Sequence, residues 1–290
     1  MGARYTFGGD EHIFVEVENE MSLSAFFKSL SITNAVRDSK ITGVTEICPA
    51  NASFQIKFNP DQIASDDLMA ELKRLEAQAG DGTDGSLKTR IIEIPVYYQD
   101  PWTHETLMRF RERHQDPKAT DIEYAARIND FKTVEEFIEA HSGSPWFVSM
   151  VGFVAGLPFL YQMVERQRQI QVPKYLRPRT DTPKLTVGYG GCFSCIYSVR
   201  GAGGYQMFGV TPMPIYDPTQ KTSYLKDFMC LFRPGDIVKW KPINREQYDQ
   251  ALADVEANRF EPVIRDVDFS LADFQKGIPA YNRKLLEVLK

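Results

Sequence analysis

The chain has 290 residues, of which 43% are hydrophobic and 25% charged, and it carries a formal net charge of -5. This length predicts two domains, and the composition is that of ordinary globular proteins. The acidic balance lacks the excess of Lys and Arg that binding to a phosphate backbone requires, so we expect no nucleic-acid partner. No run of eighteen apolar residues and no leader-like start are found, and four cysteines are too few for a disulfide scaffold. We therefore expect a cytoplasmic protein without a membrane partner.

The first segment predicts an α+β domain over residues 1–85. Apolar alternation in "HIFVEV" and "TGVTEICPANASFQIKF" is typical of half-buried strands. A helix follows, for which Ser65 is the expected N-cap and Gly80 the expected end. Small and flexible residues fill "GDGTDGS" at 80–86, so we place the domain boundary there.

A helical insertion is predicted over residues 102–142, directly after a strand at "RIIEIPVYY". Two capping-box patterns mark helix starts inside it, Thr120 with Glu123 and Thr133 with Glu136. The insertion is therefore expected to hold at least two helices.

Short β-rich runs such as "WFVSMVGF", "LTVGYGG", "CIYSV" and "DIVKWKPI" fill residues 146–243, separated by Gly and Pro. Many short strands without long helices between them favour a barrel or sandwich over a parallel sheet. We expect a mainly β second domain over residues 86–244.

The tail, residues 245–290, is predicted to be a helical extension. In "REQYDQALADVEANRF" the apolar residues share one helix face, and Ser270 with Asp273 forms a further capping-box pattern. Such a tail usually packs on its own domain, and docking on a partner subunit is the alternative.

Cys192 and Cys195 form a Cys-x-x-Cys pair, but the pattern does not favour a redox or zinc site. A redox pair needs its first cysteine at a helix N-terminus, whereas glycines precede this pair and β-prone residues follow it. A structural zinc ion needs four ligands, and no second pair with ligand spacing is present, so no bound metal is expected. The following "GAGGYQMFG" leads into a strand and not a helix, which argues against a dinucleotide loop.

His141 and Arg179 are the candidate charged groups. His141 ends the second capped helix, where interaction with the helix dipole competes with a catalytic role. Arg179 lies between prolines in a rigid segment, where it is either suited to recognising an anion or simply an exposed loop arginine.

Five motifs occur in a characteristic order: "MVGFVAGLPFL", "PRTDTP", "VGYGGCFSCIYSV", "GAGGYQMFGVTPMPIYDP" and "LFRPGDIVKWKPI". This series resembles the KipI / allophanate hydrolase subunit 1 family, and "FGGDEHIFVEV" extends the likeness to the first domain. The family includes the B component of bacterial 5-oxoprolinase and the subunit 1 half of the urea carboxylase carboxyltransferase domain. The insertion and the tail are similar to urea carboxylase segments.

The resemblance implies an α+β N-terminal domain followed by a cyclophilin-like β-barrel. It also implies pairing with a homologous subunit 2, with a substrate cleft between them, and biotin carboxylase and biotin carrier partners. The chain would then be the carboxyltransferase component of a biotin-dependent carboxylase acting on urea or a related amide. Biotin would be carried, and ATP used, on partner subunits. Two alternatives are the B component of an ATP-dependent 5-oxoprolinase, and a KipI-like regulator that inhibits a histidine kinase.

The resemblance also implies a site. Arg179 and the backbone amides of four glycines would stabilise developing charge, and His141 is the only local group expected to titrate near neutrality. Tyr197 and Gln206 would hydrogen-bond the substrate. The four glycines are Gly190, Gly191, Gly203 and Gly204. The expected pocket wall consists of Gly152, Phe153, Gly156 and Pro158.

Overall fold

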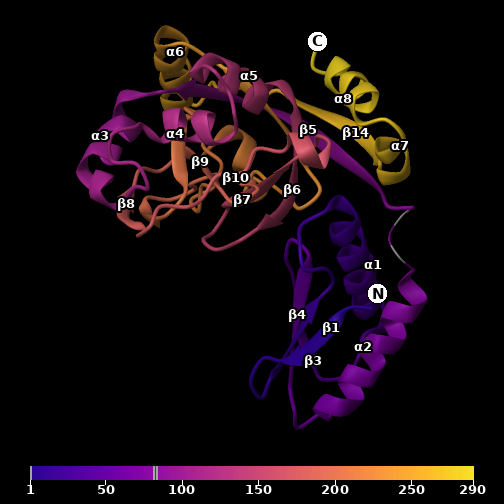
Figure 1. Cartoon of the computed structure of the whole chain (residues 1–290). Coiled ribbons are helices and arrows are strands. Elements are labelled where there is room, and N and C mark those ends of the chain that lie inside the picture. Colours follow the sequence, from indigo (N-terminus) through magenta and orange to yellow (C-terminus); the bar gives the residue numbers. More distant parts are fainter. Residues whose placement is uncertain (1, 81, 83) are drawn as a thin grey trace. The chain divides into compact units, whose positions relative to one another are not determined.

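A computed structural model describes residues 2–80, 82 and 84–290 (Figure 1). The chain forms two compact units. Unit 1 consists of residues Met1–Leu87 and Phe269–Lys276, and unit 2 of Lys88–Asp268 and Gly277–Lys290. Within the described residues, no helix has the length and apolar character needed to cross a bilayer.

Unit 1 is a four-stranded antiparallel sheet with two long helices. The strand order is β1-β2-β4-β3. The strands are β1 (Arg4–Phe7), β2 (His12–Glu16), β3 (Val44–Pro49) and β4 (Ser53–Phe58), and the helices are α1 (Leu23–Ser39) and α2 (Ser65–Ala79). The predicted alternation buries Ile13 and Val15 of β2 against Phe54 and Ile56 of β4.

The N-cap predicted for α2 is wrong by one residue. Ser65 already lies inside the helix, and Ala64 occupies the cap position without a side-chain hydrogen bond. Gly80 ends the helix as predicted, with a φ of 73° that glycine adopts without steric cost.

Unit 2 is built on an eight-stranded mixed sheet in the order β12-β9-β10-β7-β6-β13-β5-β14. The strands are β5 (Ser86–Tyr98), β6 (Pro145–Val151), β7 (Pro158–Gln162), β9 (Thr186–Gly190), β10 (Phe193–Ile196), β12 (Gln206–Val210), β13 (Ile237–Pro242) and β14 (Ile264–Ser270). A separate ribbon pairs β8 (Arg179–Thr182) with β11 (Gly201–Gly203). The result is a mixed α/β unit in which β13 runs parallel to β5.

Strand β12 also pairs with β5, through Gly209 opposite Tyr98 and Val210 opposite Tyr97. The hydrogen-bonded pairings therefore run from β12 through β9, β10, β7, β6, β13 and β5 and back to β12. The interior of this unit holds the buried side chains of Trp146, Trp240 and Phe208.

Three helices follow β5 inside the predicted insertion: α3 (Pro101–Phe110), α4 (Asp121–Ile128) and α5 (Val134–Gly143). The Thr120–Glu123 capping box is confirmed in full. Thr133 Oγ1 accepts the N–H of Glu136 as predicted, but the Glu136 carboxylate instead accepts the N–H of Lys132.

The tail is only partly helical, as the yellow segments of Figure 1 show. Its helices are α6 (Arg245–Glu256), α7 (Leu271–Lys276) and α8 (Ile278–Glu287). Strand β14 lies between them and adds to β5, which the helical prediction missed. Within unit 2, the Asn282 amide of α8 donates to the Met163 carbonyl over 2.6 Å, so this helix is fixed to its own unit.

Gly209 should be sensitive to substitution because a Cβ there would lie 2.5 Å from the Tyr97 carbonyl oxygen and 2.9 Å from Tyr98 Cα. Backbone atoms in a paired strand cannot move aside easily. We expect Gly209→Ala to lower the free energy of unfolding by about 1–3 kcal/mol, measured by urea denaturation. Gly201→Ala is the matched control, since no heavy atom of the described chain lies within 4 Å of its added Cβ. Equal stability of the two variants would contradict the tight β12–β5 pairing.

Candidate functional site

A small pocket in unit 2 gathers four of the predicted site residues, and we call it the aromatic pocket. Its volume is about 130 Å³. The lining residues are Phe153, Leu157, Phe159, Lys174, Cys195, Tyr197, Gly203, Gly204 and Tyr205. Most of its wall is aromatic or apolar, with one ammonium from Lys174 and two phenols from Tyr197 and Tyr205, as expected of a ligand site.

Two glycines let the pocket's tyrosines take their places. A Cβ on Gly203 would overlap the Tyr197 phenol, and a Cβ on Gly190 would overlap the Tyr205 ring. These positions require glycine for close approach of a ring, rather than for an unusual backbone angle. The glycine-rich segment therefore shapes the pocket through the side chains it accommodates.

Phe153 lies at the pocket in an unfavourable backbone conformation. It follows β6 in the "GFVAGLP" segment, has a φ of 69°, and exposes 74% of its surface. A bulky residue in the left-handed region is uncommon and costs about 1–3 kcal/mol, so it persists where the surroundings or the function require it. Gly156, three residues later, also has a positive φ, and a Cβ there would approach Tyr216.

A buried polar network lies beside the pocket and joins the insertion to β8 and β12. The Tyr175 hydroxyl donates to Asp121 Oδ1 over 2.5 Å, and the Met207 N–H donates to Asp121 Oδ2 over 2.6 Å. His114 Nε2 donates to Gln206 Oε1 over 2.8 Å and lies 3.7 Å from Asp121. Every carboxylate and amide oxygen named here is thus bonded.

Arg179 completes this network. Its side chain is fully buried, and its guanidinium carbon lies 4.4 Å from the centre of the Tyr175 ring. Nε donates to Thr182 Oγ1 over 3.2 Å, whereas neither Nη atom has a hydrogen-bond partner among the described residues. Burial raises the pKa of Asp121, and the Tyr175 hydrogen bond and the positive charge of Arg179 oppose that rise.

Gln206 is fully engaged inside the protein. Its side-chain amide donates to the Pro173 carbonyl over 2.9 Å and to Gln115 Oε1 over 3.1 Å, while its oxygen accepts from His114. Gln206 belongs to β12, its side chain contacts Gln115 and His114 of the insertion, and it does not line the aromatic pocket.

Gly190 and Gly191 lie next to the pocket residues without lining the pocket. The Gly191 N–H donates to the Val172 carbonyl over 2.7 Å, so this amide is already engaged. Gly152 and Pro158 flank the segment that carries Phe153, at the ends of β6 and β7.

His141 is buried in the core of unit 2 and lies outside the aromatic pocket. Its Nδ1 accepts the Tyr98 hydroxyl hydrogen bond over 2.7 Å, and its ring is stacked 5.5 Å from that of Trp240. Burial, with a contribution from the charge of Lys239, lowers the pKa of His141 to about 3. The expectation that it titrates near neutrality is therefore wrong, because a charged ring has no access to water there.

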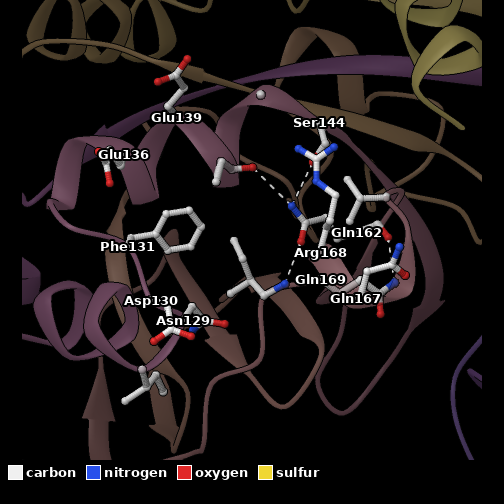
Figure 2. Close-up of a pocket in the computed structure, with 15 residues that line it drawn as sticks. Asn129, Asp130, Phe131, Glu136, Glu139, Ser144, Gln162, Gln167, Arg168 and Gln169 are labelled. Carbon is white, nitrogen blue, oxygen red and sulfur yellow. Dashed lines mark hydrogen bonds between the residues drawn. The ribbon is translucent and has the colours of Figure 1, made fainter.

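A larger cavity of about 720 Å³ lies between α5 and residues 162–170 (Figure 2). Gln162 is its buried polar group. Its amide donates to Ser144 Oγ and to the Ala140 carbonyl, and its oxygen accepts the Ile170 N–H. The described lining of this cavity includes none of the predicted site residues, and its buried amide is already satisfied, so we consider the aromatic pocket the better candidate.

Comparison with known proteins agrees with the motif series. The family described as "Carboxyltransferase domain, subdomain C and D" matches residues 3–226. The chain belongs to this family.

Relatives of this carboxyltransferase-domain chain include urea amidolyases and B components of 5-oxoprolinase. Urea amidolyase of Lachancea kluyveri is 28% identical over 280 residues, covering 94% of this chain and 15% of that protein. The B component of 5-oxoprolinase from Bacillus subtilis is 28% identical over 221 residues, covering 73% of this chain and 81% of that protein. The structure of K. lactis urea amidolyase matches with a TM-score of 0.85 and 22% identity, covering 99% of this chain and 17% of that one, which shows a shared fold.

The sequence did not identify several residues that this carboxyltransferase-domain chain brings to the site. Lys174 and Tyr175 lie in the segment before β8, and only the fold brings Lys174 to the Tyr205 ring, 5.3 Å away. Asp121 was recognisable only as the first residue of a capped helix. Its burial under β12 depends on contacts between segments 86 residues apart.

His141 should make stability depend on pH below its ordinary pKa of 6.5. Because the folded state keeps the ring neutral until about pH 3, the unfolded chain binds the extra proton, and stability falls as the pH drops below 6.5. Between pH 7 and 5 this amounts to about 2 kcal/mol. The stability advantage of the wild type over His141→Gln should shrink by that amount in urea denaturation.

If the gap between wild type and His141→Gln is equal at pH 7 and pH 5, the neutral, buried state of His141 is refuted.

Proposed function

We propose that this chain is the carboxyltransferase component, the subunit 1 half, of a multi-subunit biotin-dependent carboxylase that acts on urea or a related amide-nitrogen compound. The observation that carries the proposal is the extent of the match. The likeness to a urea amidolyase covers 94% of this chain, whereas that to the B component of a 5-oxoprolinase covers 73%. The urea amidolyase match thus extends over more of the chain.

A cyclophilin-like barrel is part of the proposal. The pairing of β12 with both β9 and β5 supports it, since a barrel requires a closed ring of paired strands, here β12 to β5 with β14 as an additional strand on β5. In such a barrel the mouth is a usual place for a ligand.

Partner subunits are required by this proposal. The chain spans 15% of the length of the Lachancea kluyveri urea amidolyase, and the other relatives include a protein named as one subunit of an enzyme. A homologous subunit 2, a biotin carboxylase and a biotin carrier would supply the remaining parts, with ATP used on the carboxylase. The four free cysteines fit a cytoplasmic location for this assembly.

The aromatic pocket is the proposed carboxyl-transfer site. Its residues fit a flat, partly apolar ring such as the ureido ring of biotin, because Tyr197, Tyr205 and Phe153 offer aromatic surfaces. When bound, carboxybiotin would supply the carboxyl group to the substrate nitrogen. The aromatic side chains of this chain would orient the ligand and exclude water, and Gly203 makes room for the Tyr197 phenol at the pocket.

Arg179 has an electrostatic role in this proposal and does not contact the ligand. It is fully buried and absent from the pocket lining, but it lies close enough to Tyr197 for its charge to affect the pKa of that phenol. Gly190 shapes the pocket through Tyr205, and Gly156 with Gly152 and Pro158 shapes the Phe153 segment. His141 and Gln206 would support the structure around the site.

The B component of an ATP-dependent 5-oxoprolinase is the second candidate function. The chain covers 81% of that protein from Bacillus subtilis, so its core is similar to a complete protein of that kind. In that case the pocket would bind a cyclic amide, and no biotinylated partner would be needed.

Gentle purification of the chain from its native cells separates the two candidates. We expect a biotinylated protein to co-purify, detected with streptavidin on a blot, because the chain needs a biotin carrier to act. Streptavidin saturated with free biotin is the control for the blot. Reproducible absence of a biotinylated band, together with ATP-dependent cleavage of a cyclic amide by the purified complex, would contradict the carboxyltransferase proposal.

A further inference from the structure

The aromatic pocket contains a phenol whose proton is available to a ligand. The Tyr197 hydroxyl accepts the N–H of Tyr205 over 3.3 Å. Within the described part of the chain, this hydroxyl has no acceptor for its own proton. A phenol carries one donor as well as its lone pairs, so the donor remains free to bind a ligand.

The groups around Tyr197 determine which acceptor its hydroxyl proton can reach. Arg179 pairs with Gly203 across the β8–β11 ribbon, and a Cβ on Gly203 would meet the Tyr197 phenol, so Arg179 and this phenol adjoin the same glycine. Burial raises the pKa of Tyr197, and the positive charge of Arg179 opposes this rise. The Tyr205 N–H donates to the phenol oxygen and occupies one of its lone pairs, which leaves the O–H available to another acceptor. Tyr197 lines the pocket whereas Arg179 does not, so a ligand bound in the pocket can accept the proton of the Tyr197 hydroxyl.

Lys174 adds a second donor to the same pocket. Its ammonium lies 5.3 Å from the centre of the Tyr205 ring, and among the described residues it forms no ion pair. The charges of Lys174 and Arg179 both act on Cys195, which is part of the pocket wall. Burial raises the pKa of the Cys195 thiol to about 12, and the charges of Arg179 and Lys174 oppose that rise.

We propose that the aromatic pocket is an oxyanion site for a small planar carboxylate. The Tyr197 hydroxyl and the Lys174 ammonium are its hydrogen-bond donors, and Arg179 is a positioning residue behind Tyr197. The site takes an anion in preference to a neutral amide of the same shape, because its donors carry or adjoin positive charge and its described lining contains no carboxylate. The identity of the natural carboxylate rests on the proposed function, whereas the anion site itself does not.

The pocket's size sets the ligand class. The volume of about 130 Å³ is below the ~300–1,000 Å³ usual for drug-sized ligands, so the pocket takes a single ring or a small group. The aromatic side chains of Phe159 and Tyr205 favour a flat group. A carboxyl group attached to a nitrogen or to one carbon meets both conditions.

Acetate binding to the full chain, without partner subunits, tests the inference directly. Acetate and its neutral analogue acetamide would be titrated by isothermal calorimetry or by ligand-detected NMR. We expect acetate to bind more tightly than acetamide. Tyr197→Phe and Lys174→Gln should each raise the Kd for acetate about tenfold or more, because each removes one charge-assisted hydrogen bond.

Two control variants match these changes in chemistry outside the pocket. Tyr224→Phe removes a hydroxyl that donates to the Pro214 carbonyl, and Lys184→Gln removes an exposed ammonium. Both should keep the wild-type Kd for acetate. If Tyr197→Phe fails to fold, Lys174→Gln still decides the outcome, because Lys174 is exposed.

The electrostatic role of Arg179 is tested by comparing a neutral substitution with one that keeps the positive charge. Arg179→Met should weaken acetate binding, and Arg179→Lys should recover part of it at matched stability, since only a charge effect distinguishes Lys from Met there. Acetate and acetamide binding with equal Kd, or an unchanged Kd for acetate in Tyr197→Phe and Lys174→Gln, would overturn the inference. A chain that binds acetate as described but copurifies with no biotinylated partner retains the anion site and loses the proposed function.

Discussion

Arg179 carries a fully buried guanidinium in unit 2, and the charge of this group must be compensated by its neighbours. The Tyr175 ring covers the guanidinium at 4.4 Å. Asp121, which accepts the hydrogen bond of the Tyr175 hydroxyl, is the carboxylate that interacts with the charge of Arg179. Isolated charges in a protein interior are costly, so this arrangement holds the insertion helix α4 against β12 and the segment before β8. The two Nη atoms have no hydrogen-bond partner within the described chain, and the positive charge of Arg179 acts on Tyr197 of the aromatic pocket.

Local features were largely predictable from the sequence, whereas the site depended on contacts between distant segments. The Thr120 cap and the Gly80 stop follow from short-range rules. The close approach of the Tyr197 phenol to Gly203 was not predicted and is seen only in the structure. The Ser65 cap failed because one residue decides whether a hydroxyl is in or before the helix. Strand β14 was missed because its pairing with β5 joins segments more than 160 residues apart in sequence, which no local pattern encodes.

Polar residues were the hardest to assign from sequence alone. Gln206 was expected to meet substrate, but its donors and acceptor are taken by Pro173, Gln115 and His114. His141 was judged by its place at a helix end, whereas the aromatic rings around it keep it neutral. In both cases burial decides the chemistry, and burial is a property of the tertiary fold. The pocket draws on Gly203, Gly204 and Tyr205 of "GAGGYQMFG" and on Lys174 before β8, and all four lie within residues 3–226 that the family match covers.

Carboxyl transfer in the reconstituted assembly, followed with isotopically labelled bicarbonate, would show whether the aromatic pocket is where the reaction occurs. Label on the biotin carrier and label on the nitrogen substrate would be measured separately. We predict that Tyr197→Phe leaves labelling of the carrier unchanged and slows transfer to the substrate by about 100-fold, the usual effect of removing one oxyanion donor. Transfer at the wild-type rate in both Tyr197→Phe and Lys174→Gln would contradict the assignment of the aromatic pocket as the site of reaction.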